Sequence, residues 1–199
     1  MNIKLNSNFY FVVIITLMLV IDRSYYFILG MLFAVMHELG HVMTILLKKS
    51  RVNKIKFGLI NIDMVYDSSS VSNINYKDEL LIYISGSLVN FMLCLIFIFV
   101  YYVNNIYFFK IIAYQNFFIG TVNLLPIESL DGHRILSVIL SRKFDINICE
   151  KILNIVSVIF LVPVSVLGII ILVKSKYNFS LLIFGVYLFS RIILKKNQV

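Results

Sequence analysis

The sequence has little of what a soluble domain or a disulfide-stabilised protein needs. Only 14% of its 199 residues are charged, against about 25% in soluble domains, and it contains two Pro, eight Gly and no Trp. Its two cysteines, Cys94 and Cys149, lie in an apolar run and in a polar connection, with no Cys-x-x-Cys pair. We therefore expect free thiols, no thiolate metal site and no long flexible linker, so residues 1–199 should form one domain.

What the sequence has in excess is apolar residues. They make up 60% of the chain, and the mean hydropathy is +0.93. This composition predicts an all-α polytopic membrane protein, and the length allows about six transmembrane helices. Residues 48–77 form the longest polar connection, and within them residues 54–64 alternate polar and apolar side chains, which predicts a short membrane-associated β ribbon between spans two and three. The six predicted spans are approximately 5–23, 25–47, 79–103, 107–125, 152–173 and 179–194.

The net charge of +8 gives the expected orientation rather than a polyanionic partner. In a multi-pass membrane protein, Lys and Arg concentrate in the cytoplasmic connections and contact anionic headgroups. Most of the 18 Lys and Arg residues fall on one side of a six-span topology if both termini are cytoplasmic. We therefore expect cytoplasmic termini, contact with the lipid bilayer and no nucleic-acid partner.

The sequence His-Glu-Leu-Gly-His lies at residues 37–41, inside the second predicted span. Two histidines four positions apart share one face of an α-helix, so His37 and His41 can bind one metal ion. Glu38 then takes the place of the general base of an HExxH metalloprotease. The alternative is that the three side chains only pack, but ionisable residues deep in a bilayer are costly, which favours a metal site that still needs a third ligand.

A second polar stretch, residues 123–134, contains the candidates for that ligand. Pro126 should end the preceding helix, and Asp131-Gly132 is typical of a turn that presents a carboxylate from a loop. Glu128 and His133 are competing ligands. Elsewhere, Asn90 in the third span is expected to form an interhelical hydrogen bond rather than to take part in catalysis.

Together the two stretches resemble the site-2 protease family of intramembrane zinc metalloproteases, through residues 37–41 and through Asn, Pro and Asp-Gly at 123, 126 and 131–132. The resemblance implies one zinc ion per chain, held by His37, His41 and Asp131, with Glu38 as catalytic acid and base. It also implies that Asn123 orients the substrate or the site. Residues 85–90 resemble the family's Gly-Pro-x-x-Asn element with Ser87 in place of Pro, which makes Asn90 a supporting residue.

Within that family, the compact arrangement resembles the branch typified by stage IV sporulation protein FB, although no nucleotide-binding CBS domain is expected here. This implies a hydrolase of a bacterial cell membrane that performs regulated intramembrane proteolysis of a membrane-tethered protein, such as a sporulation sigma-factor precursor. Membrane-bound inhibitors or regulators would be further partners. The alternative function is a membrane metal-ion transporter or sensor that uses the same His, His and Asp ligands. The substrate, the regulator and the oligomeric state do not follow from the sequence.

Overall fold

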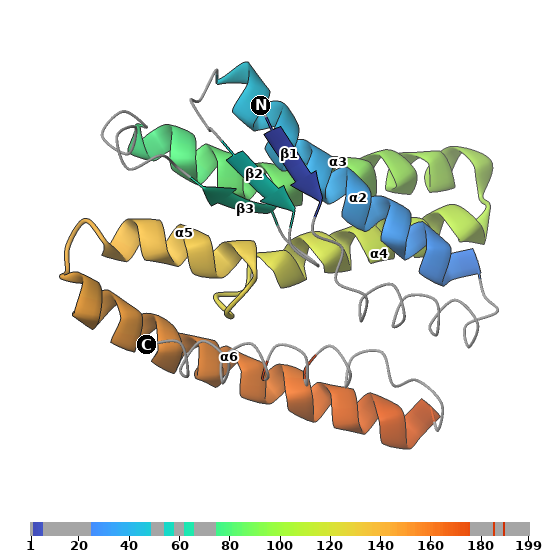
Figure 1. Cartoon of the computed structure of the whole chain (residues 1–199). Helices are drawn as coiled ribbons and strands as arrows, with labels where there is room; N and C mark the ends of the chain where they lie inside the picture. The colour runs from blue at the N-terminus through green and yellow to red at the C-terminus, as the bar shows by residue number, and fades with distance from the viewer. Residues whose placement is uncertain are drawn as a thin grey trace. The chain divides into compact units, whose positions relative to one another are not determined.

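The computed structural model describes residues 2–5, 25–48, 54–57, 62–65, 75–175, 185 and 189 (Figure 1). The chain forms two compact units, Met1–Asn123 and Leu124–Val199. Each unit is described by itself below.

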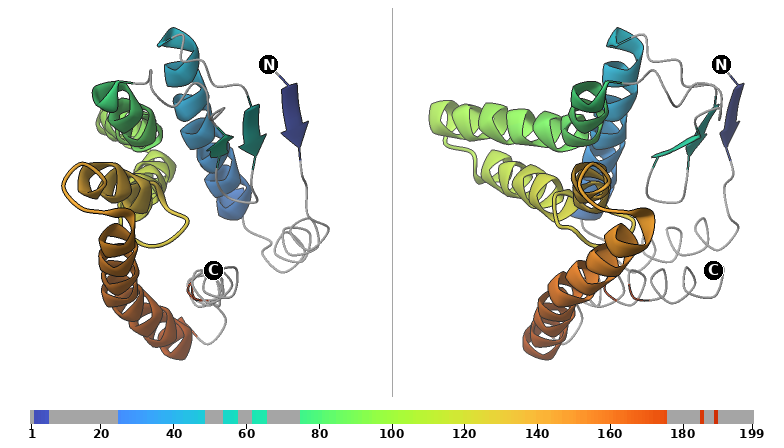
Figure 2. Two further views of the ribbon diagram at one scale, coloured as in Figure 1. Left: turned by 60° about the vertical axis from the view of Figure 1, so that its left-hand side comes forward. Right: turned by 90° about the vertical axis from the view of Figure 1, so that its left-hand side faces the viewer.

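Three helices of the first unit, α2 (Tyr25–Leu47), α3 (Tyr76–Asn104) and α4 (Tyr107–Asn123), pack against one another. Helix α3 carries Asp78 and Glu79 in its first turn, and acidic residues suit a helix N-terminus. Its C-cap is Asn105, which adopts a left-handed conformation with φ of 56° and donates its backbone N–H to the Tyr101 carbonyl. The chain thereby reverses, and α4 runs back along α3 (Figure 2).

Helices α2 and α3 approach each other closely at glycines. A Cβ added to Gly40 would lie 3.0 Å from the Ser85 carbonyl oxygen and 3.2 Å from the Cα of Gly86, so the two backbones are nearly in contact there. Gly30 of α2 makes no such approach to the described residues, since a Cβ added there would meet none of their atoms within 4 Å. At the end of α2, the Lys48 ammonium lies 2.8 Å from the Asp78 carboxylate.

The first unit also contains three four-residue strands, β1 (Asn2–Leu5), β2 (Lys54–Phe57) and β3 (Ile62–Val65), in the order β1-β2-β3. Strands β2 and β3 are antiparallel and lie where the sequence predicted a ribbon, and the residues between them, 58–61, lie outside the described residues. Strand β1 pairs in parallel with β2 and was not predicted. The four residues of β1 are too few to show a clear alternation of polar and apolar side chains, and its partner strand lies some fifty positions away in the sequence, so neither signal predicted the pairing.

The second unit contains α5 (Asp131–Leu140) and α6 (Ile146–Ser175), which pack together and run in opposite directions (Figure 1). Residues 126–151 were predicted to form a connection, and α5 was therefore not expected. Cys149 was also placed in that connection, whereas this residue lies in the first turn of α6, buried, with its thiol 3.4 Å from the Phe144 carbonyl oxygen. Both cysteines are free, as predicted.

Among the described residues, three helices are long and apolar enough to cross a membrane, at Ile28–Leu47, Tyr76–Asn104 and Ile146–Lys174. They correspond to predicted spans two, three and five. The fourth prediction corresponds to α4, a helix of 17 residues. The first and sixth predicted spans lie almost entirely outside the described residues. The described chain is mostly helical, and the number of six spans stays a prediction.

Candidate metal centre

His37 and His41 lie on one face of α2, as the spacing predicted. Each side chain is buried, and each residue is only 3% exposed. The two rings meet edge to face, with centroids 4.8 Å apart, and their Nε2 atoms are separated by 3.2 Å. The pair therefore presents two nitrogen atoms to one point between the helices.

The other nitrogen of each ring is bound to an oxygen atom of α3. The Nδ1–H of His41 donates to the Ile82 backbone carbonyl at 2.7 Å, and that of His37 donates to the Asn90 side-chain carbonyl at 2.7 Å. An oxygen that only accepts requires the proton on Nδ1. In the neutral rings both Nε2 atoms then carry lone pairs, which is the tautomer of a histidine that binds a metal through Nε2.

This geometry fits a metal ion. Two nitrogen ligands at 2.0–2.1 Å from one tetrahedral zinc ion stand about 3.3 Å apart, close to the observed separation. The α3 residue that faces the pair is Gly86. A Cβ there would lie 2.7 Å from the His37 Nε2 atom and would also collide with the His41 Nε2 atom. The missing side chain leaves the space that a bound ion needs.

Two other predicted residues of the first unit, Glu38 and Asn90, belong to the same part of the helix pair. Glu38 follows His37 directly and is half-buried. Asn90 is fully buried and forms the interhelical hydrogen bond that the sequence suggested. Asn123 is not brought into this cluster by any described contact, because its side-chain amide donates to the Ile119 carbonyl one turn earlier in α4.

Asp131 opens α5 in the second unit and is 7% exposed. The sequence predicted a turn at Asp131-Gly132 within a loop, and this was wrong, because both are the first residues of a helix. Leu130 is extended at the N-cap, and a carboxylate in the first turn suits the helix dipole. Gly132 is required by a close approach: a Cβ there would collide with the Leu124 carbonyl group and lie 2.5 Å from the Leu125 carbonyl oxygen.

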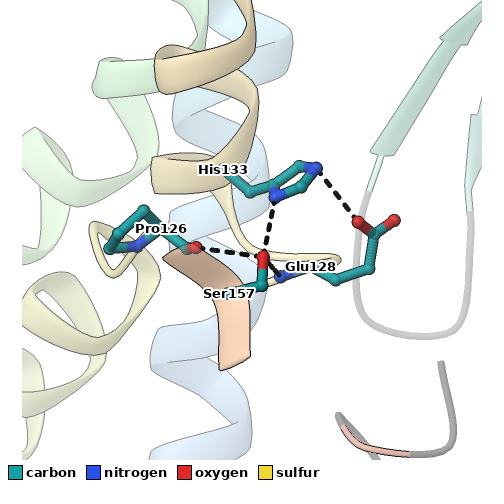
Figure 3. Close-up of polar contacts among 4 residues, drawn as sticks. All are labelled: Pro126, Glu128, His133 and Ser157. Atoms are coloured by element: carbon teal, nitrogen blue, oxygen red, sulfur yellow. Dashed lines mark hydrogen bonds and ion pairs between the residues drawn. The ribbon is translucent and has the colours of Figure 1, made fainter. Parts of the chain in front are cut away.

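The competing ligands Glu128 and His133 bind each other. The His133 Nε2 atom lies 3.0 Å from the Glu128 carboxylate, and its Nδ1 atom lies 3.2 Å from the Ser157 hydroxyl of α6 (Figure 3). Ser157 is 1% exposed, donates to the Pro126 carbonyl and accepts the Glu128 backbone N–H. Both ring nitrogens of His133 are thus occupied within the second unit, and this cluster holds the segment that leads into Asp131.

Sequence reasoning missed four contributors: Ile82, Gly86, Asn116 and Ser157. The Ile82 contribution is a backbone carbonyl, which no residue pattern reveals. Gly86 was included in the resemblance at residues 85–90, but a close approach to the two histidines was not expected of it. Asn116 and Ser157 are polar residues within apolar helices, and such a residue buried in a membrane protein indicates a hydrogen-bond partner. That signal was available for both.

Residues 103–164 match the family model of peptidase family M50, a stretch that includes Pro126, Asp131 and Ser157. No curated protein matches the chain. Among solved structures, the site-2 protease from Methanocaldococcus jannaschii is similar, with a TM-score of 0.66 and 25% sequence identity over 93% of this chain and 85% of that chain. In sequence around Asp131 and in fold over nearly its whole length, this chain therefore resembles the site-2 protease family, and the matches support a membrane metalloprotease.

Proposed function

We propose that this chain is an intramembrane zinc endopeptidase that cleaves a membrane-tethered protein. The observation that carries the proposal is the His37–His41 pair, with Nε2 atoms 3.2 Å apart and Glu38 beside them, on a helix apolar enough to span a bilayer. The M50 match and the similarity to a site-2 protease support the same activity. A buried histidine pair with a neighbouring carboxylate needs such a function to offset its cost in lipid.

We assign the third ligand to Asp131. Like both histidines it is buried, and two imidazoles with one carboxylate are a donor set that zinc accepts while keeping a fourth position open. The resemblance gives this position to Asp131, and the competing ligands His133 and Glu128 contact each other, with His133 also contacting Ser157.

In the proposed reaction His37, His41 and Asp131 would hold a zinc ion, which would supply a water molecule that is nucleophilic near neutral pH and a Lewis acid for the substrate carbonyl. Glu38 takes the proton from the attacking water and returns it to the leaving amine. The resemblance gives Asn123 the role of orienting the substrate or the site. Because a transmembrane helix satisfies its own amide groups, the substrate must unwind locally before attack. Strand β3 is at one edge of the sheet, and such an edge can pair with an extended segment.

The proposal is tested with Glu38→Gln, co-expressed with membrane-tethered transcription-factor precursors, among them a sporulation sigma-factor precursor. Loss of the proton carrier should abolish cleavage while zinc stays bound at one per chain. Glu150→Gln is the matched control, since Glu150 is exposed on α6, and it should cleave normally. Full activity of the Glu38 variant would refute the mechanism.

The transporter or sensor alternative is separated from the enzyme by two measurements on the purified chain. Zinc flux into proteoliposomes that depends on His37 would favour transport. Zinc retained at one per chain without flux, together with cleavage of a precursor, would favour the protease. The sporulation role, the bacterial membrane and any regulatory partner stay predictions of the resemblance. The cytoplasmic termini stay a prediction of the Lys and Arg distribution.

A further inference from the structure

Asn116 is a fully buried polar residue of α4 that the mechanism above does not use. Its side-chain nitrogen donates to the Ile112 carbonyl at 3.1 Å, within its own helix. Its side-chain oxygen accepts a hydrogen bond from the Asn90 side-chain nitrogen at 3.1 Å. Both ends of the Asn116 amide are therefore committed, and its oxygen is fixed toward Asn90.

This contact is the shorter of two hydrogen bonds that together decide which way the Asn90 amide points. The Asn90 Nδ2 atom donates to two oxygens, those of Asn116 and of the Phe33 backbone, at 3.1 and 3.3 Å. A flipped amide would set the Asn90 oxygen against both acceptors and lose both hydrogen bonds. In the observed orientation the Asn90 side-chain oxygen accepts the hydrogen bond from the His37 Nδ1–H.

The orientation of Asn90 in turn decides the tautomer of His37. An oxygen at 2.7 Å from Nδ1 can only accept, so the ring proton resides on Nδ1 and Nε2 keeps its lone pair. A flipped Asn90 amide would present its N–H groups to the His37 Nδ1 atom, so the ring proton would move to Nε2. The His37 Nε2 atom could then not bind a metal ion. His41 has no such dependence, because its Nδ1 donates to the Ile82 backbone carbonyl, which cannot flip.

We propose that Asn116 is a positioning residue of the metal centre: through Asn90 it keeps the proton of His37 on Nδ1 and so reserves Nε2 for the metal. The tautomer part depends only on the hydrogen bonds above. The consequence for metal binding rests on the proposed function. Groups that orient metal-bound histidines typically change metal affinity by 10–100-fold when they are removed.

The test uses the full chain in detergent, labelled with ¹⁵N at histidine and freed of metal, at a mildly alkaline pH where imidazole is neutral. Nitrogen chemical shifts distinguish the two tautomers, and single histidine substitutions assign the three rings. In Asn116→Leu, which removes the acceptor, His37 should show a substantial fraction of the Nε2–H tautomer while His41 stays unchanged. Zinc affinity, measured against a competing chelator, should fall about 10–100-fold.

The matched control is Gln115→Leu, the same kind of change at the neighbouring position of α4. It also removes an interhelical hydrogen bond, the one from Gln115 to the Tyr26 carbonyl at 3.0 Å, but not the path to His37. Both histidine tautomers and the zinc affinity should stay as in the parent. Asn116→Asp should also keep the parent tautomer, since a carboxyl oxygen at this position can accept the hydrogen bond from the Asn90 side-chain nitrogen.

If Asn116→Leu does not fold, Asn116→Ala removes the same acceptor with less bulk, and the same spectra decide. An unchanged His37 tautomer together with an unchanged zinc affinity in the Asn116 variants would overturn the inference. An equal effect of Gln115→Leu would also overturn it, since the cause would then be helix packing. If the tautomer shifts but the parent binds no zinc and cleaves no precursor, the proposed function fails and the positioning of His37 stands.

Discussion

Gly86 of α3 lies directly against His37 of α2, so that a Cβ added to the glycine would stand 2.7 Å from the His37 Nε2 atom and would collide with the His41 Nε2 atom. The glycine therefore does more than let two helices approach. It keeps open the space next to the two nitrogen atoms that are suited to bind a metal.

Gly86→Ala should accordingly reduce zinc affinity and proteolytic activity strongly, at least tenfold, because the methyl group occupies the space beside both nitrogens. Metal content after purification and cleavage of a co-expressed precursor measure this. Gly30→Ala is the control on α2, since its Cβ would meet no atom of the described residues within 4 Å. Parent-like zinc affinity in the Gly86 variant would show that the open space is not where the ion binds.

Gly132→Ala should destabilise the second unit. The added Cβ would collide with backbone atoms of Leu124, which cannot rotate away as a side chain can, so the start of α5 must shift. Overpacking of this kind costs about 1–3 kcal/mol. Thermal unfolding in detergent should show a lower Tm than the parent, and Gly30→Ala should not. An unchanged Tm would mean that residues 124–130 shift to accommodate the added methyl group without a loss of stability.

Ser157→Ala should also destabilise the second unit, because one hydroxyl serves three partners: Pro126, Glu128 and His133. Leaving buried polar groups unsatisfied costs about 1–3 kcal/mol each, so a drop in unfolding free energy of at least that size is expected. Ser141→Ala, at an exposed hydroxyl that bonds only the Val138 carbonyl, should change the Tm little. Equal effects of the two substitutions would show that the Ser157 cluster does not brace the segment.

The helix that carries the histidine pair was predicted with its observed bounds, 25–47, because sharp changes of composition limit the apolar run at both ends. The pair itself followed from helical periodicity alone. Helix α5 was missed because Asp131-Gly132 was interpreted as a turn, although Asp is equally suited to the first turn of a helix. A local pattern with two physical meanings is resolved only by what packs around it.

The proton positions of the histidines could not be predicted from the sequence. They depend on contacts between residues far apart in the chain, such as His37 with Asn90, 53 positions away, and His41 with the Ile82 carbonyl, 41 positions away. A motif identifies the ligand types, but the atoms that orient them come from the packing of α2 against α3 and α4. For the same reason, the close approach of Gly86 to both imidazoles could not be predicted from the sequence.

Removal of the metal offers a direct test of which side chain is the third ligand. A ligand that binds only the folded state adds RT ln(1 + [L]/Kd) to stability, about 2.7 kcal/mol at 100 times Kd, so chelation should lower the Tm of the parent and stop cleavage, and zinc should restore both. In Asp131→Asn the zinc-dependent rise in Tm should largely disappear. In His133→Gln the Tm without zinc should fall, because the contacts with Glu128 and Ser157 are lost, but the rise on adding zinc should persist. If instead the Asp131 variant keeps the zinc-dependent rise in Tm and the His133 variant loses it, the third ligand is His133 and not Asp131.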